Sequence, residues 1–123
     1  MGKKVLIVDD SNTMRKIIAR SLRQAGFEFE KLLEAADGQA ALEILAGETV
    51  DIVLSDINMP VMDGIEFLRQ KNADAQIKAI PVVMITTEAG TDVLNEALSL
   101  GAVGTIKKPF TPEQVQEVLG NFL

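Results

Sequence analysis

The chain has 123 residues, the usual length of one compact domain, and 47% of them are hydrophobic and 24% charged, as in ordinary globular proteins. It contains no cysteine and no histidine, which excludes disulfides, thiolate metal sites and an imidazole base, so any metal must be held by oxygen. The net charge of −6 would repel nucleic acid, and the apolar runs are far shorter than the ~20 residues of a membrane span. We therefore expect a cytoplasmic monomer with protein partners, and neither nucleic-acid nor membrane binding.

Five short apolar runs alternate with longer segments of helical spacing, which is the pattern of a parallel sheet covered on both faces. The predicted strands are residues 4–9, 31–35, 51–56, 81–86 and 103–107. The helices after them carry apolar stripes at i, i+3, i+4 spacing or close to it, formed by Met14, Ile17, Ile18 and Leu22; Ala40, Ala41, Ile44 and Leu45; Ile65 and Leu68; Val93, Leu94, Ala97 and Leu98; and Val115, Val118, Leu119 and Phe122. The fold class is thus α/β, with a single doubly wound five-stranded parallel sheet.

Capping residues support these boundaries. Thr111 precedes a proline and lies three residues before Gln114, and Asp63 lies three residues before Glu66, as in helix N-terminal caps. Three glycines follow predicted helices, at the position where a residue with left-handed backbone conformation commonly ends a helix: Gly26, Gly47 and Gly101.

Polar residues stand where four of the apolar runs stop: Asp9-Asp10, Asp56, Thr86-Thr87 and Lys108-Pro109. If the strands are parallel, all of them lie at the carboxyl edge of the sheet, where open α/β folds bind ligands. Each acid taken alone would be a helix cap or turn residue, and the lysine alone a solvated strand end. Three clustered acids, however, repel one another unless a cation offsets them, which favours a functional site.

The chemistry that fits is binding of Mg²⁺ by oxygen ligands together with phosphoryl transfer to a carboxylate. Asp10 and Asp56 are the expected direct ligands, with Asp9 bound through water. Asp56 is the expected nucleophile, because an ionised carboxylate needs no base. Phosphoryl transfer also requires charge neutralisation, which Lys108 and the Thr86 hydroxyl can supply.

The segment DINMPVMDG from Asp56 to Gly64, with Asp9-Asp10, Thr86 and Lys108-Pro109-Phe110, resembles the receiver domain of two-component response regulators. The resemblance covers the whole chain, so that residues 1–123 would form one receiver domain of the stand-alone, CheY-like chemotaxis type. It implies a flavodoxin-like (βα)5 fold with strand order 2-1-3-4-5, of which CheY is a known example.

The resemblance further implies that a histidine kinase phosphorylates Asp56 in a two-component phosphorelay. Asp9, Asp10, Asp56 and the main-chain carbonyl of Asn58 would hold Mg²⁺. The protein would not be an enzyme for other substrates, since it would catalyse only its own phosphorylation and dephosphorylation.

The resemblance also implies a switch in which the Thr86 hydroxyl and Lys108 turn toward the phosphoryl group, with a cis peptide bond between Lys108 and Pro109. The surface formed by the fourth helix, fifth strand and fifth helix would then bind a target protein that the sequence does not identify.

The chain departs from the family pattern at three positions. Thr105 stands where an aromatic residue is common, Lys107 where an apolar residue is usual, and Thr87 where alanine or serine is more common. Thr105 and Lys107 either alter the switch or merely face solvent. Asn58 and Glu88 flank the expected path of attacking water and would tune the lifetime of the phosphorylated state.

Other functions share parts of this pattern. A flavin-binding flavodoxin would need a phosphate-binding first loop, which Asp9 and Asp10 would oppose, and a haloacid-dehalogenase-type phosphatase would need an acid in place of Asn58. A relay intermediate, and a receiver-like module that is never phosphorylated, remain as alternatives to a chemotaxis regulator.

Overall fold

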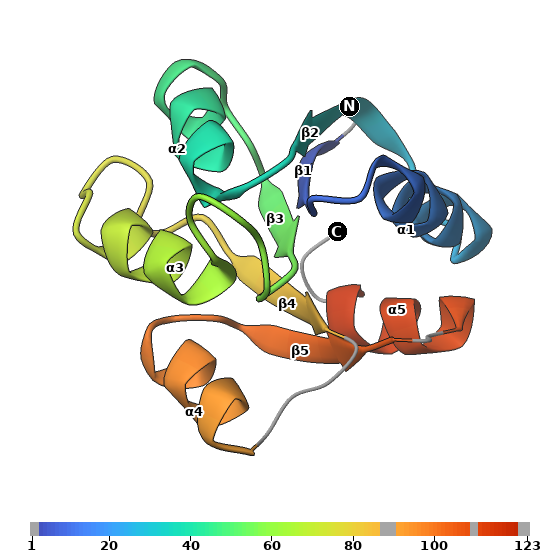
Figure 1. Ribbon diagram of the computed structural model, residues 1–123. Helices are drawn as coiled ribbons and strands as arrows, with labels where there is room; N and C mark the ends of the chain where they lie inside the picture. The colour runs from blue at the N-terminus through green and yellow to red at the C-terminus, as the bar shows by residue number, and fades with distance from the viewer. Residues whose placement is uncertain (1–2, 87–90, 109–110, 121–123) are drawn as a thin grey trace.

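A parallel sheet organises the chain, as predicted. The computed structural model describes residues 3–86, 91–108 and 111–120, and its five strands pair in the order β2-β1-β3-β4-β5 (Figure 1). The strands are β1 (Lys3–Val8), β2 (Phe29–Ala35), β3 (Ile52–Ser55), β4 (Val82–Thr86) and β5 (Gly104–Lys107). The helices are α1 (Asn12–Gln24), α2 (Gly38–Gly47), α3 (Gly64–Asn72), α4 (Thr91–Ser99) and α5 (Pro112–Leu119). None of the helices in the described ranges is long and apolar enough to cross a membrane.

Helices cover both faces of the sheet, with α1 and α5 on one side and α2, α3 and α4 on the other (Figure 1). Successive strand residues point to opposite faces, so the strands supply two separate cores. On β1, Val5 and Ile7 pack toward α1 and α5, whereas Leu6 and Val8 pack toward the other three helices. This explains why the central strands are continuous apolar runs: both faces are buried.

The helix boundaries follow from the predicted caps. Asp63 accepts a hydrogen bond from the Glu66 N–H at 2.9 Å, and Thr111 and Gln114 form a reciprocal capping box at the start of α5. Gly26 and Gly101 have φ of +93° and +103°, as expected. The prediction for Gly47 was wrong, because it is the last helical residue of α2 and an extended Glu48 ends the helix instead.

Two members of the predicted apolar stripes are exposed. Ile17 on α1 and Leu98 on α4 are 43% and 48% exposed. Both lie next to a residue of the same stripe that is buried, Ile18 and Ala97, so the stripes were predicted one residue too wide. Phe122, predicted to belong to the last stripe, lies outside the described residues.

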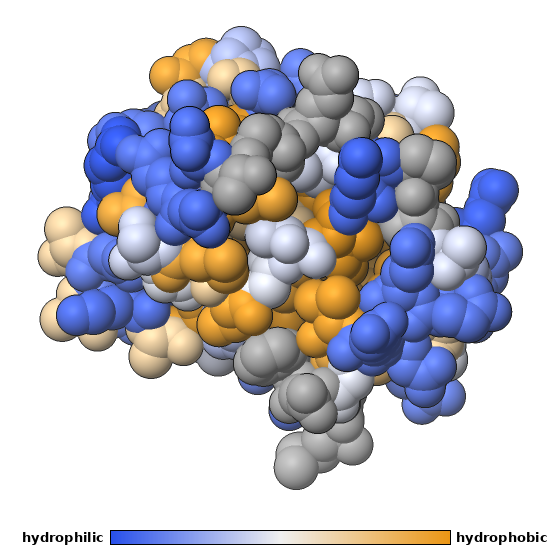
Figure 2. All heavy atoms as spheres, turned by 90° about the horizontal axis from the view of Figure 1, so that it is seen from below, coloured by the Kyte–Doolittle hydropathy of each residue, from blue (hydrophilic) through white to orange (hydrophobic). Residues whose placement is uncertain are grey.

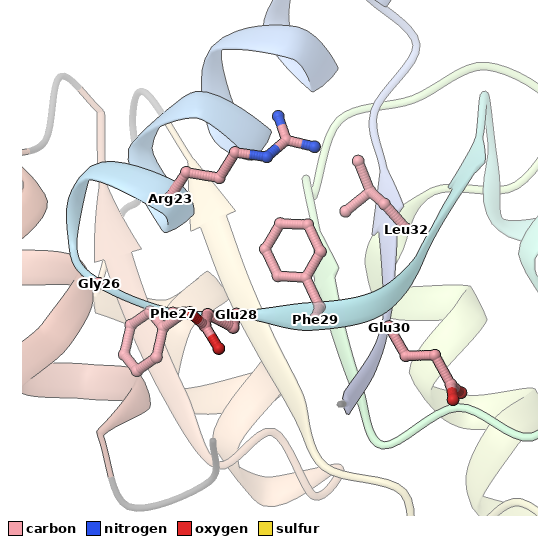
Figure 3. A pocket seen from close by; sticks show the side chains of 7 residues that line it. All are labelled: Arg23, Gly26, Phe27, Glu28, Phe29, Glu30 and Leu32. Carbon is pink, nitrogen blue, oxygen red and sulfur yellow. The ribbon is translucent and has the colours of Figure 1, made fainter. Parts of the chain in front are cut away.

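A cavity of about 490 Å³ opens at the amino edge of the sheet, where α1 connects to β2 (Figure 3). The Arg23 guanidinium carbon lies 5.3 Å from the centre of the Phe29 ring, beside Leu32, while the Glu28 and Glu30 side chains point away (Figure 3). A cation over an aromatic face is a stabilising packing arrangement. This cavity is therefore at the opposite end of the strands from the predicted acidic site.

Candidate functional site

The ends of two neighbouring strands, β1 and β3, bring the predicted acids together. Hydrogen bonds continue past the strand ends: the Asp9 N–H donates to the Ala35 carbonyl at 3.0 Å, and the Asp56 N–H donates to the Val8 carbonyl at 2.9 Å. Carboxylate oxygens of Asp9, Asp10 and Asp56 all lie within 4.8 Å of one another. The predicted acidic cluster at the carboxyl edge is thus present in the structure.

Lys108 lies among these acids. Its Nζ is 3.0 Å from Asp9 Oδ2 and 3.4 Å from Asp56 Oδ2, and its side chain is only 7% exposed. The Lys108 N–H donates to the Thr86 carbonyl at 2.7 Å, which extends the pairing of β5 with β4 by one residue. The ammonium therefore offsets the repulsion of the carboxylates from within the protein.

Asp9 is the most deeply buried of the acids, at 2% exposure, and its surroundings fix its position. Its Oδ1 accepts a hydrogen bond from the Ser11 N–H at 2.9 Å. Arg15 on α1 donates from Nη1 to the Asp9 carbonyl and from Nε to Glu34 on β2 at 3.0 Å. Sequence analysis missed both residues: the Ser11 contact is a local turn two residues after Asp9, and the Arg15 contact with Glu34 needs α1 and β2 to be packed together.

Asp56 is partly accessible, with a side chain that is 15% exposed. Its Oδ1 accepts a hydrogen bond from the Ile57 N–H at 2.7 Å, and the buried Ser55 hydroxyl donates to its carbonyl at 2.9 Å. Burial raises the pKa of the Asp56 carboxyl above its ordinary value; Lys108 and the Ile57 N–H oppose this effect, and the charge of Asp9 adds to it. The carboxylate is therefore held in place, with its charge balanced mainly by Lys108.

The donor set fits a hard divalent cation. Three carboxylates each place an oxygen in one small cluster, and the side chain of Asp10 is exposed at its rim. Mg²⁺ prefers carboxylate oxygens and retains several waters, so an open rim suits it better than a closed cage.

The other predicted site residues have different places. Thr86 is buried at the end of β4, and Asn58 is exposed on the loop between β3 and α3. On the edge strand β5, Lys107 is exposed and Thr105 is half-buried, so the solvent-facing interpretation fits Lys107 fully and Thr105 only in part. Three more predicted residues, Thr87, Glu88 and Pro109, lie outside the described residues, and with Pro109 the predicted cis bond.

The fold and the site together define a doubly wound α/β protein with an acidic cluster and a buried lysine at the carboxyl edge of its sheet. Residues 5–120 match the family model of the response regulator receiver domain. The chain is 45% identical to the chemotaxis protein CheY of Pseudomonas aeruginosa over 114 residues, which cover 93% of this chain and 90% of the relative.

Solved structures of receiver domains have the same fold as this chain. Chemotaxis protein CheY4 of Vibrio cholerae superimposes with a TM-score of 0.86 at 37% identity, with both chains covered completely. The receiver domain of a sensor histidine kinase from Pseudomonas aeruginosa, solved with a magnesium ion in its active-site cleft, gives a TM-score of 0.84 at 25% identity and covers 99% of this chain and 98% of its own.

The chain belongs to the response regulator receiver domain family. It is therefore a signalling protein of a two-component system, in which receiver domains take phosphate from histidine kinases.

Proposed function

We propose that this protein is a stand-alone, chemotaxis-type response regulator that a histidine kinase phosphorylates on Asp56. One observation carries the proposal: the Asp56 carboxylate is within 4.8 Å of oxygens of Asp9 and Asp10, and 3.4 Å from the Lys108 ammonium. This arrangement supplies a nucleophile, a cation site and a positive charge at one place. The 45% identical chemotaxis relative supports the chemotaxis role.

In the proposed reaction, the bond between a histidine nitrogen and phosphorus breaks and a bond between phosphorus and an Asp56 oxygen forms. The Asp56 carboxylate requires no proton removal, and its hydrogen bond from Ile57 fixes its orientation. When bound by Asp9, Asp10, Asp56 and the Asn58 carbonyl, Mg²⁺ would neutralise charge on the phosphoryl oxygens. These residues therefore act mainly by positioning and charge balance, as phosphoryl transfer requires.

Lys108 and Thr86 would register the new group. Phosphorylation moves negative charge from the Asp56 carboxylate to the phosphoryl oxygens, so the ammonium 3.4 Å away gains a new partner. Because Lys108 also binds Asp9 at 3.0 Å, turning toward the phosphoryl group changes the balance between its two contacts. Thr86 lies on the neighbouring strand end, from which its hydroxyl can donate to the same group.

The face formed by α4, β5 and α5 is the proposed output surface. Seen from below, this side shows hydrophobic residues gathered between hydrophilic areas (Figure 2). Leu98 on α4 and Val103 just before β5 are 48% and 42% exposed. Thr105 and Lys107 lie on β5 itself, so the edge strand carries polar side chains where the family pattern is more apolar.

The protein acts on no other substrate in this proposal. It catalyses only its own phosphorylation and dephosphorylation; Asn58 and Glu88 tune the second step, and Thr87 is a further modulating position. We also propose that residues 1–123 work as one monomeric domain in the cytoplasm.

The test is labelling by acetyl phosphate, a small phosphodonor, in the presence of Mg²⁺. We expect intact-mass measurement to find one phosphate on the wild type and none on Asp56→Asn. Asp63→Asn is the matched control, since this carboxylate lies in the same loop, caps α3 and is exposed. Undiminished labelling of Asp56→Asn would refute the assignment of the phosphoacceptor.

A further inference from the structure

Arg15, near the start of α1, joins three parts of the fold that meet beside the acidic cluster. Its Nε donates to the Glu34 carboxylate on β2 at 3.0 Å, and its Nη1 donates to the main-chain carbonyl of Asp9, just after β1. Its Nη2 donates to the Asn12 side chain at 3.3 Å. All three guanidinium nitrogens therefore have partners, and the side chain, which is only 14% exposed, is held in one orientation.

Helix stability and the ion pair do not account for this arrangement. A cation near the N-terminus of a helix opposes the helix dipole, and the first turn of α1 contains no acid that would offset it. The Glu34 side chain is 43% exposed, and an ion pair with a solvent-exposed partner contributes little to the free energy of unfolding. The contact of Arg15 with the Asp9 carbonyl is therefore the one that points to function.

The Asp9 carbonyl belongs to the peptide group that joins Asp9 to Asp10. Because a peptide group is planar, a hydrogen bond that fixes its carbonyl also fixes the direction in which the chain enters Asp10. The Asp9 N–H and side chain are held separately, by the Ala35 carbonyl and the Ser11 N–H. The Arg15 contact thus acts on the side of Asp9 that leads to Asp10.

The Asp10 carboxylate depends on its main chain for its position. Its side chain is exposed, and within the described residues it has no hydrogen bond or ion pair of its own. The carboxylates of Asp9 and Asp56, by contrast, each accept from a main-chain N–H and from Lys108. The acid at the open rim of the cluster is therefore the one that gains most from the support that Arg15 gives to the preceding peptide group.

We propose that Arg15 is a positioning residue for the divalent cation: by holding the Asp9 carbonyl, it places the Asp10 carboxylate where the cation is bound. The inference rests on the proposed function, in which Asp10 is a ligand of Mg²⁺. Replacing a residue that holds a metal ligand in place commonly lowers metal affinity by about 10–100-fold. Charge alone predicts the opposite sign, because removing the Arg15 ammonium-like charge removes a repulsion of the cation. The direction of the change in affinity therefore separates positioning from charge.

The experiment measures Mg²⁺ affinity by nuclear magnetic resonance, from the main-chain amide signals of metal-free protein as Mg²⁺ is added. Arg15→Met removes the charge and the hydrogen bonds, whereas Arg15→Lys keeps the charge but loses the planar guanidinium that binds several partners at once. We expect the dissociation constant to rise roughly tenfold for Arg15→Met, and to rise by less for Arg15→Lys. The same spectra show whether each variant is folded, so a loss of stability is not mistaken for a loss of affinity.

Arg20→Met is the matched control. It removes the same charge from an exposed position on α1, and the Arg20 side chain has no hydrogen bond or ion pair in the described part of the chain. Its dissociation constant should equal that of the wild type or fall slightly below it. An unchanged or lower constant for Arg15→Met would overturn the inference, as would an equal rise for Arg20→Met. Should Arg15→Met not fold, an unchanged constant for Arg15→Lys decides against it in the same way.

Phosphorylation gives a second readout. Half-maximal labelling by acetyl phosphate should need about tenfold more Mg²⁺ for Arg15→Met, while the rate at saturating Mg²⁺ stays within about twofold of the wild type, because only cation binding is weakened. A wild type that binds no Mg²⁺ would overturn this inference together with the cation site. If the wild type binds Mg²⁺ more tightly than Arg15→Met but is not labelled, the proposed phosphoacceptor is wrong and the role of Arg15 is supported.

Discussion

Two lysines are almost completely buried in this protein, and their surroundings differ. At the carboxyl edge of the sheet, Lys108 is 7% exposed and pairs with the carboxylates of Asp9 and Asp56. At the end of α3, Lys71 is 2% exposed and donates to the main-chain carbonyl of Lys78 at 2.9 Å; no ion pair joins it to a described carboxylate. Burial lowers the pKa of Lys71 below its ordinary value.

The difference separates a reactive region from a structural one. Around Lys108, three acids and an ammonium are concentrated beside solvent, so a phosphoryl group or a cation can redistribute their contacts. Around Lys71, one hydrogen bond to the Lys78 carbonyl fastens the connection between α3 and β4, and no described carboxylate pairs with the ammonium. A buried charge thus indicates function when its partners can change, and stabilises local structure when they cannot.

Removing the two ammonium groups should have very different effects. Lys108→Met leaves the buried Asp9 carboxylate without its ion-pair partner, so we expect it to lower the free energy of unfolding by about 3–5 kcal/mol at neutral pH without divalent cations. Urea unfolding in EDTA measures this. Lys107→Met, at the exposed neighbouring position, is the control and should change stability by less than about 0.5 kcal/mol. A loss below about 1 kcal/mol for Lys108→Met would place the ion pairs among weak surface contacts.

Mg²⁺ should bind only in the region around Lys108 and should stabilise the folded protein there. Binding to the folded state alone would stabilise the protein by about 2.7 kcal/mol at roughly 100 times the dissociation constant. Thermal unfolding of EDTA-treated protein with and without millimolar Mg²⁺ measures the shift. Asp10→Asn should remove most of it, while Asp92→Asn, on the exposed surface of α4, should retain it. An unchanged melting curve in the wild type would count against the cation site.

Lys71 should show a smaller effect that depends on pH. Its pKa in the folded protein lies below the unfolded value of 10.5, so between the two values the unfolded state binds more protons and stability rises with pH. We expect the stability of wild type relative to Lys71→Met to increase as pH approaches 10.5. At neutral pH, the two should agree within about 1 kcal/mol, because the variant loses one hydrogen bond but also one buried charge. A pH-independent difference would show that Lys71 is not desolvated.

Much of the site could be predicted because the strands end in polar residues. The apolar runs predicted four of the five strands to within one residue at each end, and parallel pairing then brought Asp9, Asp10 and Asp56 to one edge. β2 begins two residues earlier than predicted, at Phe29, because Glu30 and Lys31 on this edge strand interrupt the apolar pattern. The strand order came from the family resemblance, since periodicity does not specify which strands are neighbours.

Contacts between distant segments could not be predicted. The shorter contact of Lys108 is with Asp9, 99 residues away, rather than with Asp56. Lys71 is as deeply buried as an apolar residue, although the sequence around it predicts an ordinary exposed helix lysine. The positive φ of Val61, +66°, and the close approaches of Gly38 to Met62 and of Gly64 to Asp56 also need the folded loop. Local sequence patterns therefore predict which chemical groups are present, but they do not predict which distant groups these will contact.

The central claim is that Asp56, and neither of the two neighbouring acids, carries the phosphoryl group. Borohydride reduces an acyl phosphate to the alcohol, so treatment after incubation with acetyl phosphate and Mg²⁺ converts the phosphorylated aspartate to homoserine. Peptide mass mapping then locates it. We expect homoserine at position 56 alone, formed only when Mg²⁺ is present. Homoserine in place of Asp9 or Asp10, or equal conversion in EDTA, would refute the assignment of Asp56.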